Sequence, residues 1–185
     1  MTLRQTSQSV TGQERHLSRF IDQVLHSLDK SAIGVGLAAP QLGLNYRLLA
    51  TKLPLSPTSP QNTVLTYYLN PTIITHSQEK ATRGSQKKTD DLEGCLSVPN
   101  IYAPILRYVW IELAYQQLEN NQLVDKKIKL TDFAARVLQH EIDHLDGILF
   151  VDHMIAQNQP IFQDINGQLK KITREKFYQI FGQQI

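Results

Sequence analysis

A run of five residues near the end of the chain, His140-Glu141-Ile142-Asp143-His144, has the residue types and spacing needed for metal chemistry. Side chains four residues apart lie on one face of a helix, so the two imidazoles could bind a single tetrahedral ion. Glu141 would then lie close to the open coordination position, where a general base can act on a water molecule. The H-E-x-x-H pattern is typical of metal hydrolases. It therefore predicts a hydrolytic metal site that still needs a third protein ligand.

The surrounding sequence favours a metal site over two ordinary helix histidines. The pattern predicts a helix over residues 132–146, capped by Thr131 and ended by Gly147. One broad face of this helix combines apolar residues with residues of the pentad: Phe133, Val137, His140, Glu141 and His144. Burying two histidines and a glutamate is costly unless they have partners or a metal ion. The metal-binding face of the helix is therefore also its core face.

The position of the third ligand separates the kinds of H-E-x-x-H enzyme. Metzincins continue the pattern with a glycine and a third histidine. Gly147 fits that continuation, but Phe150 occupies the histidine position and His153 comes too late. A thermolysin-like enzyme would use a downstream glutamate, and the first one here, Glu175, is far away. Asp164 is the nearest spare carboxylate, but it lies in a polar, turn-like stretch, so it is a weak candidate.

Cys95, the only cysteine of the chain, is the remaining candidate for the third ligand. A thiolate is a strong ligand for Zn²⁺ or Fe²⁺. A single cysteine is more often a buried, inert residue, but the setting of this one, Glu93-Gly94-Cys95-Leu96-Ser97, favours the ligand interpretation.

Three motifs in this order resemble those of the peptide deformylase family. The first, Gly34-Val35-Gly36-Leu37-Ala38-Ala39-Pro40-Gln41, matches G-φ-G-φ-A-A-x-Q. The second matches E-G-C-φ-S over residues 93–97, and the third matches H-E-φ-D-H over residues 140–144. The resemblance covers residues 34–153 and includes several smaller marks: Gly43, Arg47, Asn70-Pro71, Arg107 and Gln139.

The resemblance implies a role for each residue of the site. Cys95, His140 and His144 would bind the metal ion, and Glu141 would act first as general base and then as general acid. Gln41, through its side-chain amide, and Leu96, through its backbone N–H, would donate hydrogen bonds to the developing oxyanion. The implied reaction removes the formyl group from the N-terminal formylmethionine of a newly made polypeptide and releases formate. The family's common metal is Fe²⁺, with Zn²⁺, Ni²⁺ or Co²⁺ as substitutes.

Other interpretations stay open at the level of sequence. A zincin-type endopeptidase would share the pentad, and a non-catalytic metal module would need a closed, four-ligand site, for which His153 is the only nearby spare ligand. By analogy, the substrate methionine would enter an apolar pocket. Three residues match its lining positions, although each could equally serve ordinary packing: Val35, Phe133 and Val137.

Periodicity predicts an α+β fold, and the resemblance implies antiparallel or mixed sheets packed around the central metal-binding helix of a single domain over residues 1–185. An amphipathic helix is expected over residues 13–30, with capping-box spacing of Thr11 and Glu14, and a last helix over residues 173–181. Residues 76–92 read as an exposed loop. The expected strands are residues 47–51, 64–69, 72–75, 108–116 and 123–130. Relative to the family, the first strand is expected to be missing, replaced or lost to a misassigned start, and Asp132 stands where glycine is usual.

Composition limits the cellular setting. The chain has 185 residues, 41% of them hydrophobic, and a net charge of +2, so neither a nucleic-acid surface nor a disordered chain is expected. The lysine-rich segment over residues 126–129 suits a half-exposed strand. A lone cysteine favours a reducing compartment, and the N-terminus has no apolar core of a signal peptide. We expect a cytoplasmic monomer of bacterial type that acts on nascent chains, with a possible ribosome contact and no membrane span; an organellar form is also compatible with the sequence.

Overall fold

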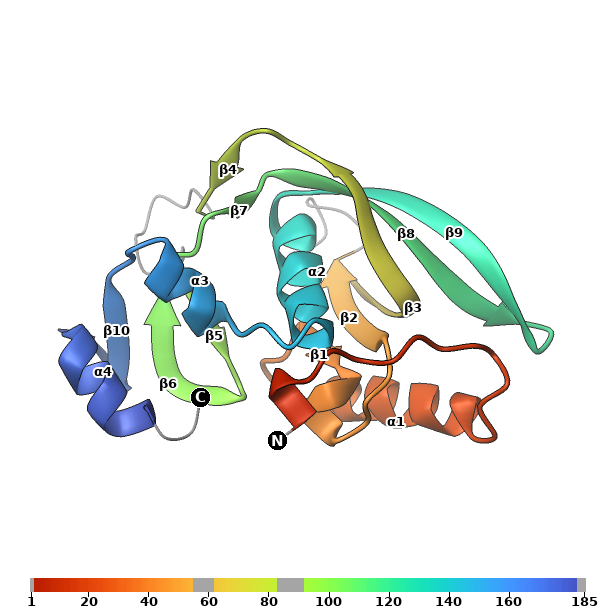
Figure 1. Cartoon of the computed structure of the whole chain (residues 1–185), viewed down its shortest axis with the longest axis horizontal. Coiled ribbons are helices and arrows are strands. Elements are labelled where there is room, and N and C mark those ends of the chain that lie inside the picture. The colour runs from red at the N-terminus through yellow and green to blue at the C-terminus, as the bar shows by residue number, and fades with distance from the viewer. Residues whose placement is uncertain (1, 55–61, 83–91, 183–185) are drawn as a thin grey trace. The chain divides into compact units, whose positions relative to one another are not determined.

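The computed structural model describes residues 2–54, 62–82 and 92–182 (Figure 1). The chain divides into two units. Unit 1 comprises Met1–Glu79 and Tyr108–Leu149, and unit 2 comprises Lys80–Arg107 and Phe150–Ile185. Both units combine β-sheet with helices, so the predicted α+β class is confirmed. Among the described residues, no helix is long and apolar enough to cross a membrane.

Unit 1 is built on a five-stranded antiparallel sheet in the order β1-β2-β3-β8-β9. Its strands are β1 (Gly36–Ala38), β2 (Leu48–Pro54), β3 (Thr63–His76), β8 (Trp110–Glu119) and β9 (Gln122–Thr131). The expected strands 64–69 and 72–75 form the single strand β3, with a register shift at Asn70-Pro71. A tight hairpin turn joins β8 to β9, and Asn120 and Asn121 both have the positive φ that such a turn requires.

Two helices cover the opposite faces of this sheet: α1 (Leu17–Lys30) and α2 (Asp132–Leu145). Successive side chains of a strand point to opposite faces, and β2 shows this directly. Leu48 and Ala50 pack in the core cluster that contains α1, whereas Leu49 packs in the cluster that contains α2. Because both faces are buried over the first half of β2, the sequence there, Leu48-Leu49-Ala50, is an apolar run rather than an alternating pattern.

The strand β9 lies at one edge of the sheet. Its segment Lys126-Lys127-Ile128-Lys129 lies in a strand, as predicted, but it is more exposed than expected: Lys126 is half-buried, and Lys127, Ile128 and Lys129 are exposed. Lys126 forms an ion pair with Glu119 at 2.6 Å, and the ammonium of Lys129 lies 4.3 Å from the centre of the Trp110 ring.

The prediction that the first helix begins at residue 13 is wrong, because α1 begins at Leu17. The Glu14 carboxylate accepts hydrogen bonds from the backbone N–H and the hydroxyl of Thr11 and from the backbone N–H of Gly12. Thr11 and Glu14 therefore close a separate turn ahead of the helix. Upstream of that turn, η1 (Thr2–Arg4) and an isolated parallel bridge between Gln8 and Tyr46 stand where the family pattern has a first strand.

The backbone at the start of α2 has a conformation that favours glycine at the position of Asp132. Thr131 occupies the N-cap position with an extended backbone, and Asp132 then adopts a φ of 52°. In this left-handed region a β-carbon costs energy, although aspartate tolerates it better than most residues. At the other end of the helix, Gly147 has a φ of 74°, as expected of a residue that ends a helix.

We expect Asp132→Gly to be more stable than Asp132→Ala by about 1 kcal/mol, because both variants lose the carboxylate and only alanine keeps a β-carbon at positive φ. Inside an ordinary helix the order is reversed, with alanine the better residue by about 1 kcal/mol. Urea unfolding of both variants at equal metal loading measures the difference. A more stable alanine variant would show that the left-handed conformation at residue 132 carries no cost.

Unit 2 holds a four-stranded antiparallel sheet in the order β11-β10-β6-β5. Its elements are β5 (Glu93–Cys95), β6 (Val98–Ala103), α3 (Phe150–Ala156), β10 (Ile161–Ile165), β11 (Gln168–Ile172) and α4 (Arg174–Phe181). The helix predicted over residues 173–181 is confirmed as α4, and Thr173 accepts the capping hydrogen bond from the Lys176 N–H. The sequence did not predict β5, β6, α3, β10 or β11.

A further pair of short strands joins β4 (Lys80–Ala81) to β7 (Arg107–Tyr108). Of the two, β4 lies within residues 76–92, which were expected to form an exposed loop. Ser77, in the same predicted loop, is buried and its hydroxyl accepts the backbone N–H of Val109. Segment 76–82 is therefore more ordered than expected, and the rest of the predicted loop over residues 83–91 lies outside the described residues.

Candidate active site

The helix α2 presents the two histidines and the glutamate of the pentad on one face, as predicted. The rings of His140 and His144 lie edge to face, with their centres 4.9 Å apart. His144 is 1% exposed and Glu141 is 5% exposed, whereas His140 is half-buried. Two neighbouring imidazoles can bind a cation, and a buried carboxylate beside them can accept and donate a proton.

The strand β1 leaves the space that the Glu141 side chain fills. A β-carbon on Gly36 would overlap the Glu141 carboxylate and lie 2.7 Å from its Cγ, closer than real contacts allow. Gly36 of the first motif therefore has a steric function, because its lack of a side chain lets the backbone of β1 approach Glu141, the candidate general base.

Replacing Gly36 with alanine is expected to lower kcat/KM by roughly 10- to 100-fold, because the added methyl group displaces the Glu141 carboxylate and small displacements of reacting groups are costly. Metal content and release of formate, the product that the family resemblance implies, report the effect. Gly34→Ala is the matched control, since its added β-carbon would meet the Ser31 side chain instead. Equal losses in the two variants would contradict a specific role of Gly36 toward Glu141.

The side-chain amide of Gln41 is oriented by the backbone of its own turn. Gln41 lies in the 3₁₀ turn η2 (Ala39–Leu42), which ends at Gly43 with a φ of 79°. Its Oε1 accepts a hydrogen bond of 2.8 Å from the Ala38 N–H. With the oxygen committed to this bond, Nε2 is the end of the amide that can serve as a donor to an oxyanion.

In unit 2, Cys95 ends the strand β5 at a tight turn formed by Leu96 and Ser97. Cys95 pairs with Val98 across this turn, and the Ser97 N–H donates to the Cys95 sulfur at 3.4 Å. Leu96 is 61% exposed at the tip of the turn. The turn therefore presents the candidate thiolate ligand and the candidate backbone donor on adjacent residues.

Phe150 and the three residues that match the methionine pocket bear on the alternatives left by the sequence. Phe150, which occupies the position of the third metzincin histidine, is 1% exposed at the start of α3, so it is a core residue. Among the residues that match the methionine pocket, Val137 is buried, Phe133 is half-buried and Val35 is 38% exposed.

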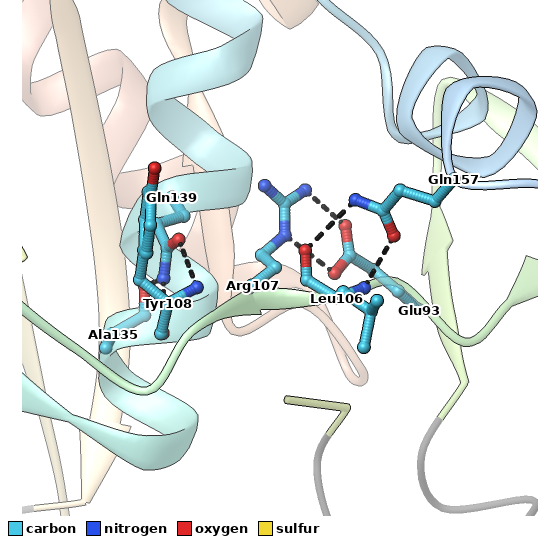
Figure 2. A network of polar contacts seen from close by, with 7 residues as sticks. All are labelled: Glu93, Leu106, Arg107, Tyr108, Ala135, Gln139 and Gln157. Carbon is cyan, nitrogen blue, oxygen red and sulfur yellow. Dashed lines mark hydrogen bonds and ion pairs between the residues drawn. The ribbon is translucent and has the colours of Figure 1, made fainter. Parts of the chain in front are cut away.

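Glutamine side chains hold the backbone on both sides of Arg107, within their respective units (Figure 2). In unit 1, Gln139 accepts from the Tyr108 N–H and donates to the Tyr108 carbonyl at 3.0 and 2.9 Å. In unit 2, Gln157 makes the equivalent pair of bonds to Leu106, at 2.7 and 3.0 Å. The sequence had marked Gln139 through the family resemblance but gave no signal for Gln157.

The candidate residues are distributed over the two units. Gln41, His140, Glu141 and His144 belong to unit 1, and Cys95 and Leu96 belong to unit 2. Within unit 1, the structure brings the histidines, the glutamate and Gly36 together.

Comparisons of the sequence with known proteins all find deformylases. A family model described as polypeptide deformylase matches residues 1–160. A peptide deformylase of Microchaete diplosiphon is 38% identical over 152 residues, which cover 82% of this chain and 73% of the relative. Peptide deformylase 2 of Nostoc sp. strain PCC 7120 is 34% identical over 182 residues, covering 97% of this chain and 89% of the relative.

Solved structures agree with the sequence relatives. A probable peptide deformylase from Synechococcus phage S-SSM7 superposes with a TM-score of 0.65 at 38% identity, covering 82% of this chain and 93% of that one. A class I type b peptide deformylase from Acinetobacter baumannii, solved with Met-Ala-Ser bound, gives a TM-score of 0.67 at 28% identity, covering 82% and 91%.

Proposed function

The chain belongs to the polypeptide deformylase family, and from this premise we propose that Cys95, His140 and His144 hold its catalytic metal ion. The protein is an enzyme that removes the formyl group from the N-terminus of newly made polypeptides, and metal dependence is general for its family. The observation that carries the residue assignment is the shared face of α2, where His140 and His144 lie side by side next to the buried Glu141.

The residues present fit a divalent transition metal. One thiolate and two imidazoles are donors that Fe²⁺, Zn²⁺, Ni²⁺ and Co²⁺ all accept. The proposed third ligand lies in the E-G-C-φ-S motif of the family, and the Ser97 N–H holds its sulfur at the turn. We propose Fe²⁺ as the native ion, with the other ions as substitutes.

The proposed mechanism assigns proton transfer and charge stabilisation to separate groups. When bound, the metal ion would supply Lewis acidity that makes a water molecule a nucleophile near neutral pH. The Glu141 carboxylate takes a proton from the water molecule while the water oxygen forms a bond to the formyl carbon. Nε2 of Gln41 and the Leu96 N–H donate hydrogen bonds to the formyl oxygen while it carries negative charge. Glu141 then gives the proton to the amine as the C–N bond breaks, which leaves formate and a peptide with a free N-terminus.

The test of this proposal is formate release from formyl-Met-Ala-Ser by protein loaded anaerobically with Fe²⁺. The choice of peptide follows the Met-Ala-Ser that the Acinetobacter enzyme binds. We expect turnover by the wild-type chain, and a lack of turnover with Fe²⁺, Ni²⁺ and Zn²⁺ alike would overturn the proposal.

Cys95→Ser is expected to lose most of its metal during gel filtration, because a neutral hydroxyl replaces a thiolate ligand. Metal analysis of the recovered protein measures this loss. Ser97→Ala, which changes the neighbouring turn and leaves the thiol, is the matched control. If Cys95→Ser keeps a full equivalent of metal, Cys95 is not a ligand.

The cellular setting is also part of the proposal. Because the motif residues are divided between the two units, we propose that residues 1–185 act together as one catalytic domain. The substrates are nascent chains, which supports a cytoplasmic enzyme of bacterial type that works near the ribosome. We propose that it acts as a monomer.

A further inference from the structure

We propose that Arg107 and Gln157 are positioning residues that hold Cys95 in the orientation needed to bind the metal ion. The inference rests on the proposed role of Cys95 as a ligand. All the contacts that support it lie within unit 2 (Figure 2).

The strand that carries Cys95 is weakly held by backbone pairing alone. β5 has only three residues, lies at the edge of its sheet, and shows a register irregularity between Gly94 and Cys95. Edge position and an irregular ladder leave a strand free to shift. Side-chain contacts can therefore contribute to the orientation of β5.

Arg107 makes a bidentate contact with this strand. Its Nε donates to Oε2 of Glu93 at 2.9 Å, and its Nη2 donates to Oε1 at 2.6 Å. Arg107 is 5% exposed and Glu93 is 8% exposed, so the bidentate pair is buried. Glu93 precedes Cys95 by two residues on β5, and a planar guanidinium fixes both the position and the rotation of the carboxylate. The ion pair therefore anchors the strand directly before the ligand.

Gln157 in turn holds the backbone that carries Arg107. Its side-chain amide accepts from the Leu106 N–H at 2.7 Å and donates to the Leu106 carbonyl at 3.0 Å, as a neighbouring strand would. Gln157 follows α3, which packs against β5, and its own N–H is bonded to the carbonyl of His153. The C-terminal part of the chain is thus connected to Cys95 through Leu106, Arg107 and Glu93.

A positioning role explains the ion pair better than stability does. Burying two charges costs desolvation energy, so such a pair contributes little net stability compared with apolar residues of the same size. Groups that orient metal ligands, by contrast, typically change metal affinity by about 10- to 100-fold when they are removed. Glu93 lies on the same strand as Cys95, so the position of the ion pair fits a role in orienting the metal ligand.

The test measures metal binding rather than turnover. Metal-free protein, kept reduced, is titrated with Co²⁺ against a chelator of known affinity, and the near-ultraviolet charge-transfer band of a Co²⁺–thiolate bond is recorded. We expect Arg107→Met to weaken Co²⁺ binding by about 10- to 100-fold and to shift or weaken the band. Gln157→Ala removes both side-chain bonds to Leu106 and should weaken binding by about fivefold, because it acts on Cys95 only indirectly, through Arg107 and Glu93. Arg107→Lys should give an intermediate affinity, because lysine restores the charge without the bidentate geometry.

Matched controls come from unit 1. Lys126→Met removes a cation from the exposed Lys126–Glu119 pair, and Gln117→Ala removes an amide bonded to the Tyr67 carbonyl. If the Arg107 and Gln157 variants keep the affinity and band of these controls, the inference is overturned. If Arg107→Met fails to fold, Arg107→Lys and Gln157→Ala decide the outcome by the same criterion. If wild-type protein binds Co²⁺ without a thiolate band, the proposed ligand set itself fails, and this inference fails with it.

Discussion

Replacing Glu141 with glutamine is expected to lower kcat by about 10²- to 10⁴-fold while the protein keeps its metal ion. Glutamine has nearly the same shape as glutamate, so it should fit the space beside Gly36 and preserve the packing of α2. It cannot accept the proton of the attacking water or return one to the amine. The loss should therefore appear in kcat rather than in metal content.

Formate release under saturating substrate, together with metal analysis of the same sample, separates the two effects. Glu112→Gln on β8 is the matched control, because it makes the same chemical change in unit 1 at a residue outside the proposed machinery. A Glu141→Gln variant that retains more than about a tenth of wild-type kcat would exclude Glu141 as the main proton carrier. A variant that loses its metal would show that Glu141 also supports metal binding.

Replacing Gln41 with glutamate is expected to reduce kcat/KM by about 10²- to 10³-fold, as for removal of one oxyanion donor. One oxygen of the new carboxylate can still accept from the Ala38 N–H, so the η2 turn should persist. The other oxygen would replace the Nε2 donor with an acceptor and, in its ionised form, would repel the developing oxyanion. The loss of kcat/KM in Gln41→Glu is therefore expected in a protein that is still folded.

Gln41→Met should lose activity to a similar degree and should also release the Ala38 N–H, which the urea midpoint would register. The control for added charge is Gln23→Glu on the exposed side of α1. If Gln41→Glu is no less active than Gln23→Glu, the amide of Gln41 does not stabilise the transition state.

The parts of the fold that could be predicted are those with strong local patterns. The β8–β9 hairpin combines alternating apolar residues with the turn at Asn120-Asn121, and α2 combines helical periodicity with Gly147 at its end. The first helix was predicted to begin four residues early because the spacing of Thr11 and Glu14 fits a helix cap, whereas these residues close a turn of their own.

The elements of unit 2 had weaker signals. Four of the five residues of β11 are exposed, so the strand shows almost no apolar alternation. The Asn166-Gly167 turn, with positive φ at both residues, was the available sign of the β10–β11 hairpin, since this dipeptide is a strong hairpin signal.

The candidate site was predictable where its residues are close in sequence or belong to a family motif. His140, Glu141 and His144 share a face because helical geometry places them there. Gly36 belongs to the first motif, but its contact with Glu141 depends on how β1 packs against α2. Gln157 was missed because its bonds to Leu106 join residues 51 positions apart, and a single glutamine has no pattern that reveals such a contact.

The lysines of β9 have a consequence for how this enzyme behaves at high concentration. An open edge strand offers unpaired backbone groups to other chains, and this is a common route to aggregation. Lys127 and Lys129 are exposed along this edge, and an approaching β9 of a second molecule would bring like charges together. The charged edge would keep crowded copies of the enzyme from joining their sheets, and so protect its colloidal stability where newly made chains are abundant.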